Sequence, residues 1–523
     1  MTFCAHLHKT CPPRIKSKTY ILDESSTLLT RNITERQIIG QSLQLLPSIK
    51  AKMKSLSFDV CLCLALSCVS KIDAVKKHLS NVSPAMISRT QKLVPPGRAP
   101  PIRDSVVRNV QTDQGASIPS EIFNLVKSIV GAGVLGLPAG IAAFGNAPSA
   151  LIPSTLLVIG IGLLSAYGFS LIGRICAYTG ATSYREAWAK SVSEQTSWIP
   201  AMCCLLVTTC SVLAYSMILA DTVPMLLETA GITITRTQAL VGVTSTVLFP
   251  LCRLKEMKKL APFSLVGIIG MCYTAFAMTV RFIGGEYRQG GIFFESMPAH
   301  LRPSFGNKGA MASFNSNTFL LVSMLSTAFM AHYNAPKFYL ELRNNTIPRY
   351  MIVVGASFLI SIIMFIVVAS LGFLTFGQAA SGLVLNNYST SDTLMSVSRI
   401  AVALSLTCSY PLAFGGVRDG VLDFAKVPIA KRSNSFMNVL TIGLLGIITC
   451  VAYIIRDLGT VLAFAGATWG NALIYLFPTF MLIQSAKKMP GLQKEVPIAA
   501  ATGLVGLTMG VIGTIRAVKN ACS

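Results

Sequence analysis

The sequence predicts an all-α integral membrane protein with eleven transmembrane helices. Only 12% of the 523 residues are charged and 52% are apolar, whereas soluble domains carry about 25% charged residues. The mean hydropathy is +0.60, and the apolar residues gather in long runs. So few charges cannot cover a water-exposed surface, and this composition excludes an ordinary cytosolic enzyme.

Residues 1–118 are predicted to form a disordered, basic cytoplasmic tail, followed by a transmembrane domain over residues 119–523. Proline pairs at 95–96 and 100–101 break the tail, and it shows no sustained periodicity. Its apolar patch at residues 58–69 would be about 18 Å long as a helix, too short for the ~30 Å hydrocarbon core. We therefore interpret that patch as a signal-like or interfacial stretch and not as a span.

Eleven apolar segments follow the tail, and most exceed the ~17–25 residues that cross a bilayer as a helix. Backbone groups in lipid must be paired inside the segment, and these runs are too long and too uniform for the strands of a barrel. The segments are residues 122–142, 149–177, 198–228, 235–251, 262–284, 313–335, 347–376, 393–416, 436–455, 457–485 and 496–517.

Basic residues between the segments predict the orientation. With the tail in the cytoplasm, the connections on that side contain 17 Lys and Arg, against 8 on the other side. This excess places the N-terminus in the cytoplasm and the C-terminus outside or in a lumen. The net charge of +23 is thus explained by the lipid bilayer as partner, and no nucleic acid partner is predicted. The same topology leaves the glycosylation sequon at Asn387 accessible in an external loop.

The sequence predicts neither an enzyme nor a metal or cofactor site. Most of the 14 cysteines lie in the tail or inside apolar runs, where thiols behave as small apolar groups, and none has zinc-ligand spacing. A membrane-embedded enzyme would need clustered His, Asp or Cys side chains, and the chain has five histidines, three of them in the tail. A Walker A motif for ATP-driven pumping is also missing from the sequence.

The first apolar segment is rich in residues that weaken a helix: Gly131, Gly133, Gly136, Pro138 and Gly140. A helix that breaks inside a membrane exposes amide N–H groups of one half and carbonyl groups of the other. These groups suit the carboxylate and the ammonium of an amino acid. The alternative is a face of small residues that lets helices pack closely. We favour the broken helix.

Residues 128–138, SIVGAGVLGLP, resemble the signature of the amino acid/auxin permease family, which includes vacuolar amino acid permeases and sodium-coupled neutral amino acid transporters. Further stretches agree in order between about residues 121 and 517. They are FPLCRLKEMKKLAPFS at 249–264, AFMAHYNAPKFYLEL at 328–342 and SYPL at 409–412. The tail is not covered by the resemblance.

The resemblance implies a LeuT-type fold, in which spans 1–5 and 6–10 form a 5+5 inverted repeat with one extra helix. It also implies that the first helix of each repeat is broken, so that the sixth segment faces the first across the substrate site. No glycine marks a break there. The predicted substrate-binding residues are Ile129, Val130, Gly131, Ala132, Gly133, Ser326, Thr327 and Tyr215.

Lys127 is the most unusual residue of the first segment, because a lysine inside a membrane costs roughly 2.5–3.5 kcal/mol. In the amino acid/auxin permease family, which this sequence resembles, sodium-coupled members usually have asparagine at this position and proton-coupled members often have lysine. An ammonium can occupy the space of a sodium ion, and a buried lysine can carry a proton. The predicted ion-coupling residues are Lys127, Thr407 and Ser409. The alternative is that Lys127 snorkels to the cytoplasmic interface.

Three further polar residues lie within the apolar segments. Asp221 and Arg399 are expected at the external interface. His332, near the end of the sixth segment, is interpreted as a buried, hydrogen-bonded histidine, with a role in gating or pH sensing as the alternative.

Together these features predict a secondary active transporter of amino acids, coupled to H⁺ or working by exchange, that uses alternating access around the broken first helix. The alternative is an amino-acid-sensing membrane receptor with little net transport. The resemblance and Lys127 favour a vacuolar, lysosomal or other endomembrane location over the plasma membrane.

Overall fold

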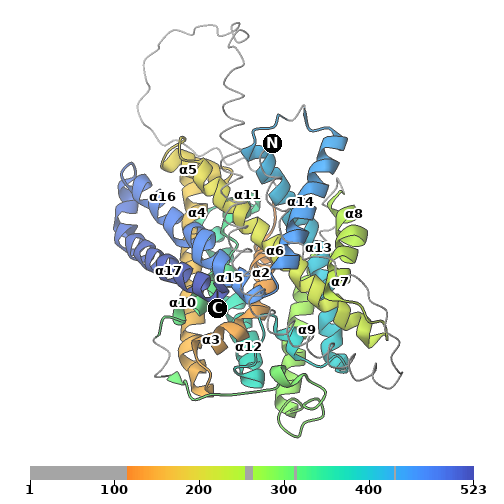
Figure 1. Cartoon of the computed structure of the whole chain (residues 1–523). Helices are drawn as coiled ribbons and strands as arrows, with labels where there is room; N and C mark the ends of the chain where they lie inside the picture. The colour runs from red at the N-terminus through yellow and green to blue at the C-terminus, as the bar shows by residue number, and fades with distance from the viewer. Residues whose placement is uncertain (1–114, 254–262, 311–314, 429–430, 523) are drawn as a thin grey trace, which may run out of the picture. The chain divides into compact units, whose positions relative to one another are not determined.

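The computed structural model describes residues 115–253, 263–310, 315–428 and 431–522. The predicted tail up to residue 114, including the apolar patch at 58–69, lies outside these residues. In the described part, regular structure is helical apart from two isolated β-bridges (Figure 1). Eight of the described helices are long and apolar enough to cross a membrane, or nine if one bent pair counts as a span. The all-α membrane fold is therefore confirmed.

The described residues include four that precede the predicted domain boundary at residue 119, and they make regular contacts. Helix α2, Ile118–Ile129, has Ser117 as its N-cap, and the residue before the cap pairs with a distant segment. Ala116 donates its N–H to the carbonyl of Glu341 at 2.8 Å and accepts from the N–H of Arg343 at 2.9 Å. Residues 115–118 thus pack with the segment after α11, while the division into a tail and a transmembrane domain stays a prediction.

The first apolar segment is broken, as the glycine pattern predicts. Helix α2 ends at Ile129, and the chain continues as the 3₁₀ helix η1, Ala132–Gly136, and then α3, Leu137–Phe144. The two halves are bent by 42° relative to each other. Pro138 stands in the first turn of α3, where proline is favoured because the N–H groups there have no partner inside the helix.

The sixth segment is broken as well. Helix α10, Thr318–Ala328, stops before residues 329–331, and the chain resumes as η7, His332–Asn334, and α11, Ala335–Glu341. Pro336 lies in the first turn of α11. Proline lacks an N–H group and suits the first turn of a helix, where that group would have no partner, so a new helix can begin here without any glycine.

The remaining helices follow the predicted apolar segments. Two of these segments contain π-helical turns: residues 236–252 and residues 458–486, the latter with the π turns η10, Gly466–Gly470, and η11, Ala472–Leu476. The helices are α4 Leu151–Thr179, α5 Tyr184–Ser191, α6 Trp198–Thr229, α7 Arg236–Val243, α8 Phe249–Cys252, α9 Phe263–Gly284, α12 Ile347–Phe376, α13 Thr393–Phe424, α14 Asn434–Ile454, α15 Leu458–Ala465, α16 Phe477–Ala486 and α17 Val496–Cys522.

The number of spans stays a prediction. The fourth apolar segment is a short helix made of three pieces, and the sixth is split by its break, so neither qualifies as a span by length and composition. The 5+5 repeat likewise remains an expectation. What the structure does show is a helix break in both the first and the sixth segment.

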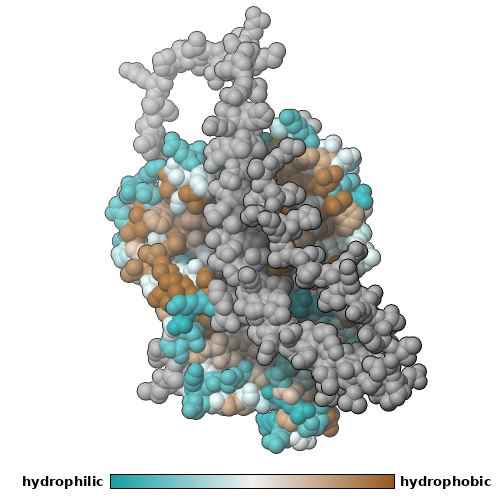
Figure 2. Space-filling model, in the orientation of Figure 1, coloured by the Kyte–Doolittle hydropathy of each residue, from teal (hydrophilic) through white to brown (hydrophobic). Residues whose placement is uncertain are grey.

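Apolar side chains cover much of the outer surface of the transmembrane unit. Figure 2 shows brown, apolar residues on the left flank of the visible face and teal, polar residues gathered at its lower end. Large apolar side chains are exposed on α4, α12, α14 and α17, with Ile152, Leu359, Val439 and Leu504 each more than half exposed. Such a surface is stable against lipid tails and not against water.

Polar contacts join the connections in the way that the predicted topology requires. On the predicted cytoplasmic side, Arg185 contacts Asp423 at 3.0 Å and Arg174 pairs with Glu495. Asn146 accepts from the N–H of Lys308 at 2.9 Å on the opposite side. These contacts agree with the alternation of the segments, while which side faces the cytoplasm stays a prediction.

One expectation about the external loops is wrong, and a second residue there is more buried than its position suggests. Asn387 is only 1% exposed, and its side-chain amide donates to the carbonyl of Ala379 at 2.8 Å, so the sequon is not accessible. Arg399 is fully buried, and its guanidinium donates to the carbonyls of Leu385 and Tyr388 at 2.9 and 2.6 Å, while its place at the external interface stays a prediction. In both cases the loop before α13 folds back over the helix ends and covers the side chain.

Candidate functional site

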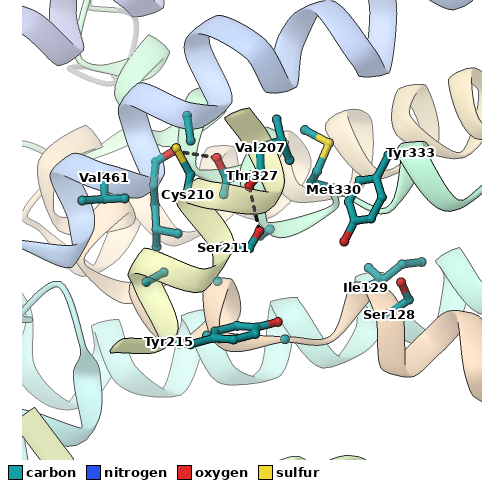
Figure 3. A pocket seen from close by; sticks show the side chains of 17 residues that line it. Ser128, Ile129, Val207, Cys210, Ser211, Tyr215, Thr327, Met330, Tyr333 and Val461 are labelled. Atoms are coloured by element: carbon teal, nitrogen blue, oxygen red, sulfur yellow. Dashed lines mark hydrogen bonds between the residues drawn. The ribbon is translucent and has the colours of Figure 1, made fainter. Parts of the chain in front are cut away.

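The two helix breaks meet at a cavity of about 70 Å³ (Figure 3). Gly131, Ala132 and Gly133 of the first break lie on one side, and Thr327 and Ala328 at the end of α10 lie on another. Helices α6 and α15 close the remaining sides. The structure thus brings together two segments that are almost 200 positions apart, as the resemblance implies.

The backbones of the two breaks approach each other closely. A Cβ atom on Gly133 would lie 3.1 Å from the Cα atom of Ala328 and 3.4 Å from its Cβ atom. Gly131 has more space, since a Cβ atom there would have the hydroxyl oxygen of Tyr215 as its nearest neighbour, at 4.0 Å. Position 133 therefore leaves little room for a side chain, whereas position 131 has more space beside the cavity.

Helix ends supply charge-complementary backbone groups at the first break. The last α-helical bond runs from the N–H of Val130 to the carbonyl of Val126 at 2.7 Å, and the N–H of Gly131 then turns back to Ile129. The amides of Ala132 and Gly133 begin a new helix, so they have no acceptor inside it. This arrangement offers N–H donors for a carboxylate beside the carbonyl-rich end of α2 for an ammonium.

Hydroxyl groups add acceptors to the cavity. Ser211 donates to the carbonyl of Val207 at 3.0 Å, and Thr327 donates to the carbonyl of Leu462 at 2.5 Å. Because each hydroxyl proton is used by the backbone, the oxygen lone pairs remain to accept from a ligand. Figure 3 shows Tyr215 on one side of this space and Tyr333 on the other, both with their hydroxyl ends turned toward it.

A second cavity of about 40 Å³ contains Lys127. Gly131, Ala132 and Tyr215 line both cavities, so the two adjoin. Lys127 stands in the last turn of α2, where its positive charge complements the negative end of the helix. The lysine is half-buried beside this cavity, and its role in ion coupling stays a prediction.

Gly267 of α9 makes room for this lysine. A Cβ atom on Gly267 would lie 2.5 Å from the hydroxyl oxygen of Ser405 and 3.7 Å from the Cε atom of Lys127. Ser409 lines the same cavity as Lys127, but Thr407 lines neither cavity. Residues two positions apart on a helix point in nearly opposite directions, so Thr407 and Ser409 cannot both face the lysine.

Most of the other predicted site residues reach the cavities. Ile129 lines the first and Val130 the second. Ser326 does not line either cavity. It is buried, donates to the carbonyl of Val322 at 3.0 Å and lies 3.4 Å from the hydroxyl of Tyr475.

Sequence reasoning missed several lining residues. Ser211 lies one helical turn before Tyr215, so the 3.6-residue period could have revealed it. Ser405 lies one turn before Ser409 in the same way. Gly267, Cys210 and Tyr333 carry no such signal, because their positions depend on how the helices pack.

His332 is fully buried beside the second break. Its Nε2 atom lies 2.9 Å from the carbonyl oxygen of Ser165, and its ring packs edge-on against Phe169 with centroids 5.5 Å apart. These contacts support the interpretation of a buried, hydrogen-bonded histidine that packs the second half of the broken segment against α4.

Comparison with known proteins agrees with this geometry. Residues 114–516 match the family described as "Transmembrane amino acid transporter protein". The chain belongs to this family. The match confirms the resemblance to the amino acid/auxin permeases, and the members of the family are transporters and not enzymes.

Similar proteins come from plants, animals and yeast. "Amino acid transporter AVT6E" of Arabidopsis thaliana is 25% identical over 436 residues, covering 78% of this chain and 85% of the relative. "Putative sodium-coupled neutral amino acid transporter 11" of Mus musculus is 22% identical, with coverages of 80% and 88%. "Vacuolar amino acid transporter 2" of Saccharomyces cerevisiae is 21% identical, with coverages of 74% and 82%.

Among solved structures, a Na⁺-coupled sialic acid symporter in a substrate-bound outward-open state matches with a TM-score of 0.46 and 14% identity. The alignment covers 76% of the transporter described here and 88% of the symporter.

Cys210 provides a native chemical probe of the first cavity, which it lines from α6. We expect a small methanethiosulfonate reagent to block most amino acid uptake by the wild-type transporter, because the added group fills the cavity. Cys210→Ala should resist the reagent, and excess amino acid should protect the wild type. Uptake into proteoliposomes measures both effects.

Cys272→Ala is the matched control, since Cys272 is exposed on α9 and lines neither cavity. This variant should stay as sensitive as the wild type. If Cys210→Ala were inhibited to the same extent as the wild type, the cavity would not lie on the transport path.

Proposed function

We propose that this protein is a secondary active transporter of amino acids. The observation that carries the proposal is the cavity at which the breaks of the first and sixth segments meet. Transporters place substrates at such breaks because an unwound helix offers backbone donors and acceptors without unpaired groups in lipid. The names of the relatives, which describe amino acid transporters, support the same substrate class.

The substrate would bind as a zwitterion. Its carboxylate accepts from the amides of Ala132 and Gly133, and its ammonium donates to the carbonyl end of α2 and to the oxygens of Ser211 and Thr327. Alternating access then moves the helices on one side of the cavity relative to those on the other, with the two breaks as the points that bend.

The cavity favours small neutral amino acids. A water molecule needs about 10–15 Å³ on the same volume scale, so about 70 Å³ holds a handful of heavy atoms. The side chains that line this cavity are apolar or hydroxyl-bearing apart from Cys210 and Met330, and none is charged. A cationic or anionic substrate side chain would lack a counter-ion there.

We propose that amino acid transport is coupled to protons or works by exchange. Lys127 places a tethered cation next to the substrate cavity, and a second cation would be repelled from the same space. An ammonium that loses its proton in one state of the cycle would couple transport to H⁺. Some relatives are named as sodium-coupled, so the coupling ion is the point that experiment must decide.

We further propose an endomembrane location, vacuolar or lysosomal, with the N-terminus in the cytoplasm. The vacuolar names of relatives from two yeasts support this assignment. The excess of basic residues in one set of connections supports the orientation.

Uptake into proteoliposomes under a pH gradient or a Na⁺ gradient tests the proposal. We expect radiolabelled neutral amino acids to accumulate when the external side is acidic, and we expect no change when Na⁺ is replaced by choline. A strict sodium requirement would contradict the coupling proposal. Amino acid binding without flux under either gradient would favour the sensing receptor.

A further inference from the structure

Glu121 is a buried carboxyl group in the first turn of α2, six residues before Lys127. Its residue surface is only 1% exposed. Within the described part of the chain, neither of its carboxylate oxygens has a hydrogen-bond partner. The transport mechanism proposed above does not use this residue.

Glu121 lies where the two broken segments are joined. The bridge between Ala116 and Leu342 connects the residues before α2 to the residues after α11. The fit is tight, because a Cβ atom on Gly115 would lie 2.7 Å from the Cα atom of Arg343. Helix α2 also packs against α12, where Ser357 donates to the carbonyl of Ile122 at 3.3 Å.

The charged groups nearest to Glu121 belong to α11. Glu341 and Lys337 act on its charge with opposite signs, and Lys337 lies 3.9 Å from Glu341 at an exposed position. Neither forms a hydrogen bond with Glu121.

The other helices packed against α2 do not supply a counter-charge. Arg349 of α12 donates to the carbonyl of Arg343 at 3.1 Å, and Tyr350 donates to the carbonyl of Phe169 at 3.2 Å. Helix α9 carries one charged residue, Arg281 near its far end, which binds Asp392. Lys127 of α2 itself faces the second cavity.

A carboxyl group that is buried without donors is stable as the neutral acid and unstable as the anion. When the start of α2 separates from α11 and α12, water reaches the group and the anion becomes stable. The packed arrangement cannot re-form at low cost until a proton has returned. The protonation of Glu121 and the packing at this end of the bundle are therefore linked.

We propose that Glu121 is a second proton-binding group of the transport cycle, protonated while the start of α2 is packed and ionised when this end opens. The O–H bond of the acid breaks on opening, the proton passes to water on that side, and reclosure takes one proton back. This inference rests on the proposed proton-coupled transport. It adds a site for H⁺ at the end of the path, apart from Lys127 at its centre.

Glu121→Gln tests the role, because the amide keeps the shape and cannot release a proton. In proteoliposomes we expect this variant to lose uptake driven by a pH gradient by about tenfold or more. It should keep amino acid counterflow, in which loaded carriers exchange without net proton movement. Glu341→Gln is the matched control, since Glu341 is exposed beside the same bridge, and it should retain both activities.

If Glu121→Gln took up amino acids under a pH gradient at the wild-type rate, the inference would be overturned and the proposed function would be left intact. Absence of pH-driven uptake in the wild type would instead overturn the proton coupling itself, and this role with it. Infrared spectroscopy gives a readout that does not depend on transport. The wild type should show the carbonyl band of a protonated carboxylic acid near neutral pH, and Glu121→Gln should lack it. A wild-type spectrum without that band would also overturn the inference.

Discussion

Replacement of Gly133 by valine is expected to abolish amino acid uptake while the protein remains in the membrane. The first added carbon would lie 3.1 Å from the Cα atom of Ala328, which is backbone and cannot rotate away. The two breaks would be forced apart, and the amides of Ala132 and Gly133 would move relative to the substrate. A displacement of about 1 Å at a reacting or binding centre costs roughly 100-fold in rate.

Two further glycine variants make this prediction specific. Gly160→Val on α4 is the control, because a Cβ atom there meets nothing within 4 Å, and its uptake should equal that of the wild type. Gly131→Ala should cause a smaller loss than Gly133→Val, since its nearest neighbour would be the Tyr215 hydroxyl at 4.0 Å. Wild-type uptake by Gly133→Val would show that the substrate site lies elsewhere.

Replacement of Lys127 by methionine is expected to abolish accumulation driven by a pH gradient. Methionine has nearly the same length and fills the second cavity, but it removes the charge beside the carbonyl end of α2 and the site for a proton. Net uptake should fall by about tenfold or more, because the variant lacks the ammonium that Lys127 places in the second cavity. Proteoliposome uptake across a series of external pH values measures the loss.

The two hydroxyl residues of α13 provide the internal comparison. Ser409 lines the cavity with Lys127, so Ser409→Ala should weaken the dependence on pH. Thr407→Val should leave uptake unchanged, because Thr407 lines neither cavity. An unaltered pH dependence in Lys127→Met would remove this lysine from the coupling mechanism.

The sequence was sufficient for the fold class, the helical segments and the first break. Length and apolarity decide whether a segment is stable in lipid, and the glycines and proline of residues 131–140 weaken a helix wherever it is placed. The second break has a weaker signal, Pro336, which suits the first turn of a new helix. Most of the backbone of the candidate site could therefore be predicted before any packing was known.

Residues whose surroundings come from other segments were predicted less well. Asn387 was expected to be accessible and Arg399 at the external interface, and the packing of the loop before α13 buries both side chains. Ser326 and Thr327 are neighbours in the sequence, yet only Thr327 lines the cavity. Glu121 shows no unusual feature in the sequence. Its burial results from the bridge between residues 116 and 342 and from the packing of α2 on α12.

The sequence by itself determined that this chain is a helical membrane protein with a broken first helix and a lysine one turn before the break, because these properties depend on residue type and local spacing. Only the tertiary structure decided which side chains share a cavity with that lysine and which carboxyl group is buried without a partner. Those properties depend on contacts between segments that are far apart in the chain, and a one-dimensional pattern carries no record of them.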